Sequence, residues 1–237
     1  EDKTDRSAIF SKWGGFINNI EFFDPLFFQI THREAELMDP QQKLFLQCGW
    51  QLMEDAGYAC IETRNTSNIG VYVGVTWNEF SALAHDLSAG ENTYKGAGSL
   101  YWSIPNRLSY FLDLKGPSVA LDSACSSSLV AVHDACQALK SGECDMAIAG
   151  GVNLNLHPDK YIFLSQNHFL ASDGRCKSFG EGGDGYVPGE GVAAVLLKPL
   201  LAAEKDHDYI YGLVKAATSN HGGKVTGYTV PNPVAHK

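Results

Sequence analysis

The residue with the clearest capacity for covalent chemistry is Cys125, which lies among small residues in the run from Asp122 to Leu129. A thiol at the start of a helix meets the positive end of the helix dipole, which favours the thiolate, the nucleophilic form of cysteine. The small neighbours Ala124 and Ser126 would leave the sulfur open to a large electrophile. Free cysteines are nevertheless usually buried and inert. Spacing alone therefore leaves two interpretations open for Cys125, a nucleophile and a structural thiol.

The segments on either side of Cys125 should hold it where a strand becomes a helix. Residues 118–121 are short and apolar and follow a Gly-Pro pair, which favours the start of a strand. From Leu129 to Leu139, apolar residues recur at helical spacing. Asp122 and the serines between these segments can supply capping side chains. The sequence predicts a buried strand, a tight turn that carries the cysteine, and a helix.

The rest of the chain alternates expected strands and helices. Helices are expected at 41–56, 104–112, 161–169 and 200–204, with a helix and loops within 77–98. Strands are expected at 68–75, at 145–149 (closed by a pair of glycines), at 192–197 and at 210–219. We expect residues 1–39 to form an irregular surface segment that phenylalanines pin to the core. Strands that alternate with helices indicate an α/β layered fold with a mixed or parallel sheet.

Composition excludes several function classes. The 237 residues suffice for a sizeable core, and 44% are hydrophobic and 19% charged, as in ordinary globular proteins. The 18 basic and 27 acidic side chains give a net charge of −9, which argues against a nucleic-acid partner. There is no apolar run long enough to predict a membrane span. The six cysteines have neither metal-ligand nor disulfide-framework spacing, which favours reduced thiols, no metal site and a cytoplasmic location.

Other candidate residues carry less specific signals. The glycine-rich loop 180–191 lacks a phosphate-binding motif and leads into an expected strand, so a structural loop that lines a site is favoured. His133 lies about two helical turns beyond Cys125 and is interpreted as a core histidine. His221 is the best local candidate for a base, although a structural loop role is favoured. Asp173, Asp184 and Glu190 could be paired acids, but turn-capping or solvated roles are commoner in glycine loops.

The run Asp122-Ser123-Ala124-Cys125-Ser126-Ser127-Ser128-Leu129 resembles the active-site motif of the beta-ketoacyl synthases, the ketosynthase domains of modular polyketide synthases. Further runs resemble family signatures in the family order, at 22–25, 33–36, 38–42, 54–57, 106–113, 149–152, 173–179 and 184–191. Together these motifs cover nearly the whole chain. The runs 180–184, 220–223 and 231–233 look most like the trans-acyltransferase branch, whose assembly lines use a separate acyltransferase.

The resemblance implies a thiolase-like fold of the α/β class, in which two related halves stack as an α/β/α/β/α sandwich. This chain would supply mainly the first half, so residues 1–237 are expected to be a partial ketosynthase domain. The resemblance also implies a homodimer, in which the strand before Cys125 pairs across the dimer axis.

The resemblance further implies acyltransferase activity in polyketide biosynthesis. Cys125 would be the nucleophile, and its backbone N–H would be one oxyanion donor. It would take an acyl chain from the phosphopantetheine arm of an acyl carrier protein. A decarboxylative Claisen condensation with a malonyl-type extender would follow. The implied partners are the acyl carrier protein, a second copy of the domain and neighbouring synthase domains, with no membrane and no directly bound cofactor.

The chain departs from the family pattern by omission. The family's two catalytic histidines, one of them in a His-Gly-Thr-Gly-Thr run, their accompanying lysine and the usual first strand have no counterpart here. None of the eight histidines of the chain fills this gap. We therefore expect no condensation by this chain alone, whereas acylation of Cys125 could survive. A non-elongating ketosynthase, which passes acyl chains on without condensation, is the alternative function. An unrelated cysteine hydrolase would need a histidine and an Asn or Asp around Cys125.

Overall fold

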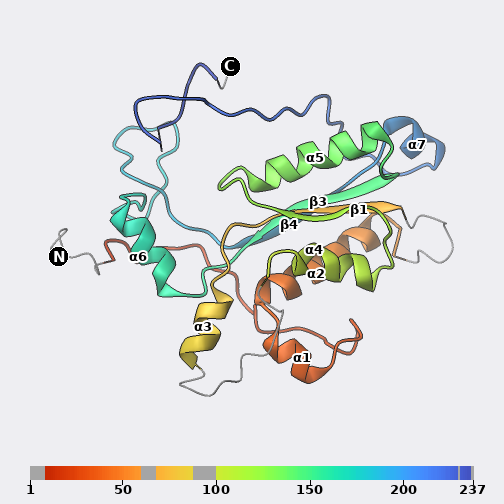
Figure 1. The fold of residues 1–237 in the computed structure, drawn as a ribbon, viewed down its shortest axis with the longest axis horizontal. Helices are drawn as coiled ribbons and strands as arrows, with labels where there is room; N and C mark the ends of the chain where they lie inside the picture. Colours follow the sequence, from red (N-terminus) through yellow and green to blue (C-terminus); the bar gives the residue numbers. More distant parts are fainter. Residues whose placement is uncertain (1–8, 60–67, 88–99, 229, 236–237) are drawn as a thin grey trace.

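Four strands form one mixed sheet between two layers of helices (Figure 1). The computed structural model describes residues 9–59, 68–87, 100–228 and 230–235. In spatial order the strands are β2 (Ser118–Leu121), β1 (Ile69–Gly74), β3 (Met146–Asn153) and β4 (Gly191–Leu197). The helices are α1 (His32–Leu37), α2 (Pro40–Asp55), α3 (Phe80–Leu87), α4 (Ser103–Phe111), α5 (Ser127–Ser141), α6 (Pro158–Gln166) and α7 (Leu200–Lys205).

Strand direction decides where the cysteine turn lies. β1 runs parallel to both β2 and β3, while β4 runs antiparallel to β3. The carboxyl ends of β1, β2 and β3 therefore meet at one edge of the sheet. In open α/β sheets this edge is where ligands usually bind. The turn that carries Cys125 follows β2 at this edge.

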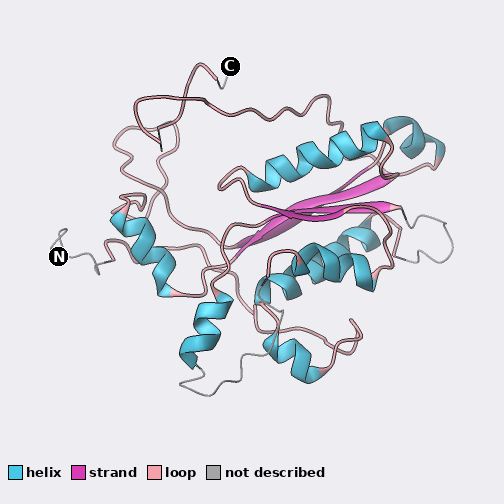
Figure 2. Ribbon diagram, in the orientation of Figure 1, coloured by secondary structure: helices cyan, strands magenta, loops and turns pink. Residues whose placement is uncertain are grey.

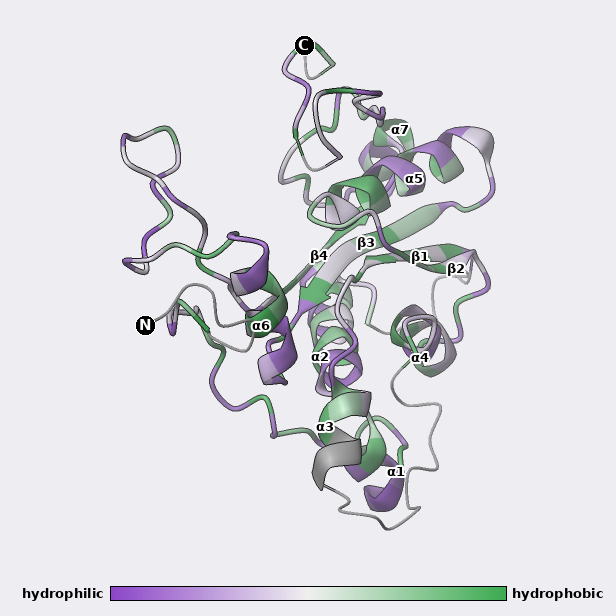
Figure 3. Cartoon of the chain, turned by 60° about the vertical axis from the view of Figure 1, so that its left-hand side comes forward, coloured by the Kyte–Doolittle hydropathy of each residue, from purple (hydrophilic) through white to green (hydrophobic). Residues whose placement is uncertain are grey.

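Different helices cover the two faces of the sheet (Figure 2). Helices α2 and α4 cover one face with large side chains such as Phe45, Met53 and Leu108, all of them fully buried. Helix α5 covers the other face through alanines, among them Ala131 and Ala135. Figure 3 shows hydrophobic residues in the strands, while the surrounding helices carry both hydrophobic and hydrophilic residues. Because all six residues of β1 are buried, its sequence is a continuous apolar run rather than an alternating one.

Local signals explain both ends of α2. Asp39 caps α2 by accepting a hydrogen bond from Gln41 N at 2.8 Å, and Pro40 occupies the first turn, where no amide proton is needed. Gly57, with φ of +75°, lies just beyond the end of α2 as predicted. Strand predictions for β1, β2 and β4 and the helix predictions for α2, α4, α5 and α7 are confirmed to within a few residues.

The prediction that the strand at 145–149 closes at its glycines is wrong. β3 continues through Gly150 and Gly151 to Asn153. A Cβ on Gly150 would lie 2.3 Å from the carbonyl oxygen of Ala193 on β4. Gly150 therefore permits a close approach of β4, and Gly151, whose Cβ would lie 3.0 Å from the Cβ of Ser128, permits one of α5. Neither glycine ends its own strand.

The strand predicted at 210–219 is also absent, because this segment is irregular in the structure. Its side chains are open to solvent, with Tyr211 80% and Leu213 58% exposed. Its sequence has the apolar character of a strand, but no strand within the described ranges pairs with it. A strand needs a neighbour to satisfy its backbone, so sequence character alone does not form one.

Two further boundaries differ from the predictions. The helix expected at 161–169 begins three residues earlier, at Pro158, where His157 Nδ1 accepts a hydrogen bond from Asp159 N. Of the irregular segment predicted at 1–39, residues 1–8 lie outside the described ranges, and residues 9–39 are largely irregular with Phe28 buried. This segment also contains α1, which Thr31 caps through Glu34 N. In the stretch 77–98, α3 agrees with the predicted helix, and residues 88–98 lie outside the described ranges.

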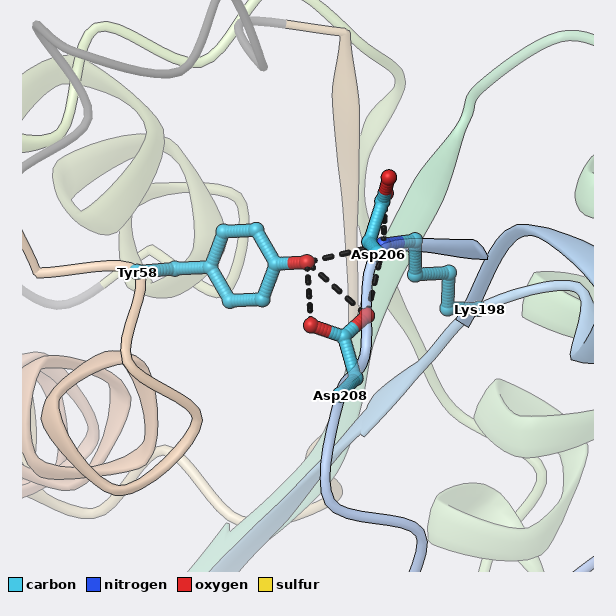
Figure 4. A network of polar contacts seen from close by, with 4 residues as sticks. All are labelled: Tyr58, Lys198, Asp206 and Asp208. Carbon is cyan, nitrogen blue, oxygen red and sulfur yellow. Dashed lines mark hydrogen bonds and ion pairs between the residues drawn. The ribbon is translucent and has the colours of Figure 1, made fainter. Parts of the chain in front are cut away.

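A partly buried ionic cluster lies at the edge of the sheet away from Cys125 (Figure 4). Lys198, just after β4, donates to Asp206 at 2.5 Å, to Asp208 at 2.6 Å and to the hydroxyl of Tyr58 at 2.8 Å. Tyr58 in turn donates to Asp208 at 2.7 Å. Burial acts to lower the pKa of Lys198, but the two carboxylates outweigh it and raise the pKa above its ordinary value. The cluster joins the loop after α2 to the segments around α7.

Candidate active site

Cys125 lies exposed in the turn between β2 and α5. The helix begins at Ser127, with Ser126 at the N-cap position, so the cysteine immediately precedes the helix start. The strand, turn and helix predicted around this residue are therefore confirmed. The strand is not buried as predicted, because no residue of β2 is fully buried and Val119 is 39% exposed. The exposed thiol also favours the nucleophile over the buried structural thiol that the spacing had left open.

The backbone of the turn is strained at the residue before the cysteine. Ala124 has φ of +55°, in the left-handed region that non-glycine residues rarely adopt. Its N–H donates to Asp122 Oδ1 at 2.8 Å, and its carbonyl accepts from the Ser127 hydroxyl at 2.6 Å. Such conformations cost on the order of 1–3 kcal/mol and persist where their surroundings fix them. Here side chains hold both polar groups of the strained residue.

The prediction that the serines of the motif cap the helix is wrong. Their side chains form hydrogen bonds within the turn instead. The Ser126 side chain makes no cap hydrogen bond. It donates instead to Ser123 O at 2.9 Å. The Ser127 hydroxyl accepts from Ser123 N at 2.9 Å, while it donates to the carbonyl of Ala124. The side chains thus stabilise the shape of the turn.

Sequence reasoning missed Thr76, which follows the carboxyl end of β1. Thr76 Oγ1 donates to Asp122 Oδ1 at 2.8 Å, across 46 positions of sequence. The carbonyl of Thr76 is itself held by the Tyr101 hydroxyl at 2.6 Å. The only available signal was that Thr76 follows a buried strand whose carboxyl end lies at the same sheet edge as Asp122. These contacts tie the cysteine turn to β1.

The glycine-rich loop brings Tyr186 near the cysteine. Tyr186 is anchored by its N–H to Phe169 O at 2.8 Å and by its carbonyl, which accepts from Ala171 N at 2.9 Å. Burial raises the pKa of Tyr186, and the charges of the nearby Cys125 and Tyr161 raise it further. This placement agrees with the expectation that the loop lines a site.

The acids considered as a possible pair have separate structural partners. Asp173 forms an ion pair with Lys177 at 2.9 Å, and Asp184 accepts from Ser172 N at 3.3 Å. Glu190 accepts from Ile17 N at 2.8 Å and from Asn155 N at 2.9 Å. Each carboxylate thus holds a loop in place, as the turn-capping alternative predicted.

The two histidines also have local partners. His133 Nδ1 lies 3.0 Å from the carbonyl oxygen of Ala217. His221 Nδ1 accepts a hydrogen bond from Gly223 N at 2.9 Å within its own turn. These contacts agree with the structural interpretation of both residues.

The sequence also did not predict a buried polar network, which lies next to the residues that follow β3. Lys160 is 3% exposed and donates to Asn153 Oδ1 at 2.8 Å and to Leu154 O at 3.0 Å. Burial lowers its pKa to about 8, although the carboxylates of Glu79 and Glu190 oppose this shift. Glu79 Oε2 accepts from Leu156 N at 2.9 Å. Burial raises the pKa of Glu79.

Asp39 extends this network to the start of α2. Its carboxylate is buried, and burial raises its pKa to about 6 against the opposing hydrogen bonds from Gln41. Gln41 reaches both strand ends, because its side chain donates to Trp77 O at 2.8 Å and accepts from Leu154 N at 3.3 Å. The network fixes the loops that follow β1 and β3.

No group of three or more His, Cys, Asp or Glu side chains in the described ranges is arranged to hold a metal ion. No helix in the described part of the chain is long and apolar enough to cross a membrane.

Comparison with known families decides what this site belongs to. Residues 1–203 match the family model described as the beta-ketoacyl synthase N-terminal domain. The chain belongs to the beta-ketoacyl synthase family. Its match covers the strained turn, Cys125, the whole four-stranded sheet and Thr76.

Polyketide synthases are among the curated relatives of this beta-ketoacyl synthase chain. Polyketide synthase PksL of Bacillus subtilis is 53% identical over 241 residues, which cover 99% of this chain and 5% of PksL. Polyketide synthase ThaG of Burkholderia thailandensis is 53% identical over 224 residues, covering 94% of this chain and 4% of ThaG. The chain thus spans only a small part of the curated relatives it matches.

Solved ketosynthases have the same fold. The oxazolomycin ketosynthase domain OzmH KS7 of Streptomyces albus superposes with a TM-score of 0.92 at 46% identity, covering 99% of this chain and 41% of that one. A ketosynthase from module 6 of the Bacillus subtilis bacillaene synthase superposes with a TM-score of 0.88 at 43% identity, covering 96% of this chain and 38% of that one. The predicted thiolase-like α/β fold is confirmed, and this beta-ketoacyl synthase chain supplies its N-terminal half.

Proposed function

We propose that this chain is the cysteine-bearing half of a polyketide synthase ketosynthase and that Cys125 accepts an acyl chain from an acyl carrier protein. The observation that carries the proposal is the exposed Cys125 in a turn whose strained backbone is held by Asp122 and Ser127. Structural cysteines are usually buried, and they need no such turn. Family membership supplies the substrate class, an acyl thioester on a phosphopantetheine arm.

The proposed reaction is a thiol–thioester exchange. The Cys125 sulfur attacks the carbonyl carbon of the acyl thioester, and the carbonyl oxygen becomes an oxyanion. The backbone N–H of Cys125 donates to that oxyanion. When the intermediate collapses, the bond to the phosphopantetheine sulfur breaks, and that thiol leaves with the proton that the Cys125 thiol gave up. The products are an acyl-cysteine and a free carrier thiol, so no oxidant, metal or bound cofactor is consumed.

The second step, decarboxylative condensation with a malonyl-type extender, belongs to the complete domain. The two histidine motifs that the family uses for it do not occur in this sequence. Elongating and non-elongating ketosynthases share the acylation step, so the proposal for Cys125 holds for both. We expect a homodimer, neighbouring synthase domains and the trans-acyltransferase branch as its setting, and the cytoplasmic location stays a prediction.

Mass spectrometry tests the acylation directly. A complete ketosynthase domain that contains this chain is incubated with an acyl carrier protein loaded with a short acyl thioester. We expect one acyl adduct, located on the peptide that contains Cys125, and no adduct on the Cys125→Ala variant. A wild-type domain that acquires no acyl group, or a variant that acquires it undiminished, contradicts the assignment.

A further inference from the structure

The direction of the Cys125 N–H is set by the peptide group that joins it to Ala124. A peptide group is planar and trans, so its C=O and N–H point in opposite directions as one rigid unit. The carbonyl of this group accepts from the Ser127 hydroxyl at 2.6 Å and from the Ser127 backbone N–H at 3.1 Å. Whatever holds the carbonyl of Ala124 therefore also aims the N–H of Cys125.

Ser127 is itself fixed on several sides. It is only 5% exposed, and its hydroxyl oxygen accepts from Ser123 N at 2.9 Å. A serine hydroxyl has a single proton, and here the 2.6 Å contact directs that proton to the carbonyl of Ala124. A Cβ on Gly74 would lie 2.5 Å from the backbone of Ser127, so the glycine of β1 leaves room for this residue against the sheet.

The other side of Ala124 is held through Thr76. Asp122 Oδ1 accepts from Ala124 N at 2.8 Å and from Thr76 Oγ1 at 2.8 Å. Thr76 Oγ1 also lies 3.4 Å from the carbonyl oxygen of Ala124. The strained residue is thus clamped between Ser127 on its carbonyl and the Asp122–Thr76 pair on its amide.

We propose that Ser127 is a positioning residue for the acylation of Cys125, supported by Thr76 through Asp122. Its hydroxyl orients the Ala124–Cys125 peptide so that the cysteine N–H points at the developing oxyanion. Ser127 itself forms no covalent bond and does not touch the reacting atoms. This inference rests on the function proposed above.

Acylation and alkylation of the Cys125 sulfur together distinguish a positioning role of Ser127 from a general structural role. Acylation by the carrier thioester passes through an oxyanion that needs the N–H, whereas alkylation by iodoacetamide displaces iodide and forms no oxyanion. In the complete domain, Ser127→Ala should acylate about tenfold more slowly or worse, since loss of one oxyanion donor typically costs ~10²–10³ in rate. Its alkylation rate should stay within about twofold of wild type, because that reaction does not use the lost interaction.

Matched variants complete the design. Ser141→Ala removes a serine hydroxyl that donates to Ala138 O at the far end of α5, and its acylation rate should equal that of wild type. Thr76→Val removes the donor to Asp122 and should slow acylation selectively, while Thr76→Ser should restore the rate. If Ser127→Ala does not fold, the Thr76 variants decide the outcome on their own.

Three results would overturn the inference. A parallel fall of acylation and alkylation would show that the whole turn, and not the N–H direction, had changed. Unchanged acylation in the folded Ser127 and Thr76 variants would show that neither residue positions the peptide. A wild-type domain without an acyl adduct would overturn the proposed function together with this inference, whereas the first two results leave that function intact.

Discussion

At the scale of single residues, the site depends on polar side chains that belong to the structure rather than to the reaction. Ala124 occupies a strained conformation because Asp122 and Ser127 bond both of its polar backbone groups. This arrangement prepares the backbone around Cys125 before any substrate arrives. Preorganised backbone donors of this kind need little rearrangement during the reaction.

Asp39 makes the stability of the domain depend on pH. Its pKa is about 6 in the folded protein, against an ordinary value of 3.8, because burial disfavours its charge. Between these values the folded state binds more protons than the unfolded state, so the free energy of unfolding falls as pH rises. The loss between pH 4 and pH 7 should be of the order of 2–3 kcal/mol, at about 1.4 kcal/mol per pKa unit.

Urea denaturation at pH 5 to 7.5 measures how the free energy of unfolding changes with pH. The complete wild-type domain is compared with its Asp39→Asn variant. The amide keeps an acceptor for the helix cap but does not titrate, so the variant should lose this part of the pH dependence. If both proteins show the same slope of unfolding free energy against pH, Asp39 is not the group responsible.

At the scale of elements, the position of the cysteine depends on the close contact between β1 and the start of α5. In Gly74→Ala the new methyl would lie 2.5 Å from backbone atoms of Ser127 and Ser128, which forces the helix start to move. Overpacking of this kind typically costs about 1–3 kcal/mol. We expect the variant to melt at a lower temperature and to acylate Cys125 more slowly.

Gly189→Ala is the control, because no atom outside its immediate neighbours lies within 4 Å of a methyl at that position. Its melting temperature and acylation rate should match those of wild type. Equal behaviour of the two variants would mean that the β1–α5 contact tolerates a methyl and does not set the position of the turn.

Elements with strong local signals could be predicted from the sequence. The strand, turn and helix around Cys125 follow from apolar spacing and flanking Gly-Pro residues, and α2 follows from Asp39, Pro40 and Gly57. β3 was predicted too short, because a glycine pair that permits close strand packing has the same sequence as one that ends a strand.

The supporting part of the site could not be predicted from local patterns. The contact between Thr76 and Asp122 depends on the pairing of β1 with β2, in which Gly74 lies opposite Leu121. The network of Lys160 and Glu79 likewise depends on tertiary contacts, because both residues bond to the segment that follows β3. The spacing of residues in the sequence indicates the nucleophile, whereas the order of the strands in the sheet brings Thr76 to Asp122.

At the scale of the whole molecule, the chain exposes much apolar surface. Leu129 in α5 is 74% exposed, and Tyr209, Tyr211 and Leu213 are 81%, 80% and 58% exposed. Contiguous apolar surface promotes association or aggregation when nothing covers it. The remainder of a ketosynthase domain would supply such a cover.

We therefore predict that residues 1–237 alone are poorly stable. Size-exclusion chromatography should show aggregates, and a hydrophobic dye should bind more strongly per residue than to the complete domain. The isolated chain should also fail to catalyse condensation. A monomeric chain with one cooperative thermal transition would contradict the prediction of instability.

The ionic cluster of Lys198, Asp206, Asp208 and Tyr58 and the turn of Cys125 lie at opposite edges of the sheet. β4 runs antiparallel, so Lys198, which follows it, lies near the amino end of β3, whereas Cys125 follows the carboxyl end of β2. The ion pairs of this cluster and the reactive cysteine thus lie at opposite ends of the parallel strands. Substitutions near the ionic cluster could therefore raise the stability of such a domain, while substitutions near Cys125 are selected for a new acyl preference.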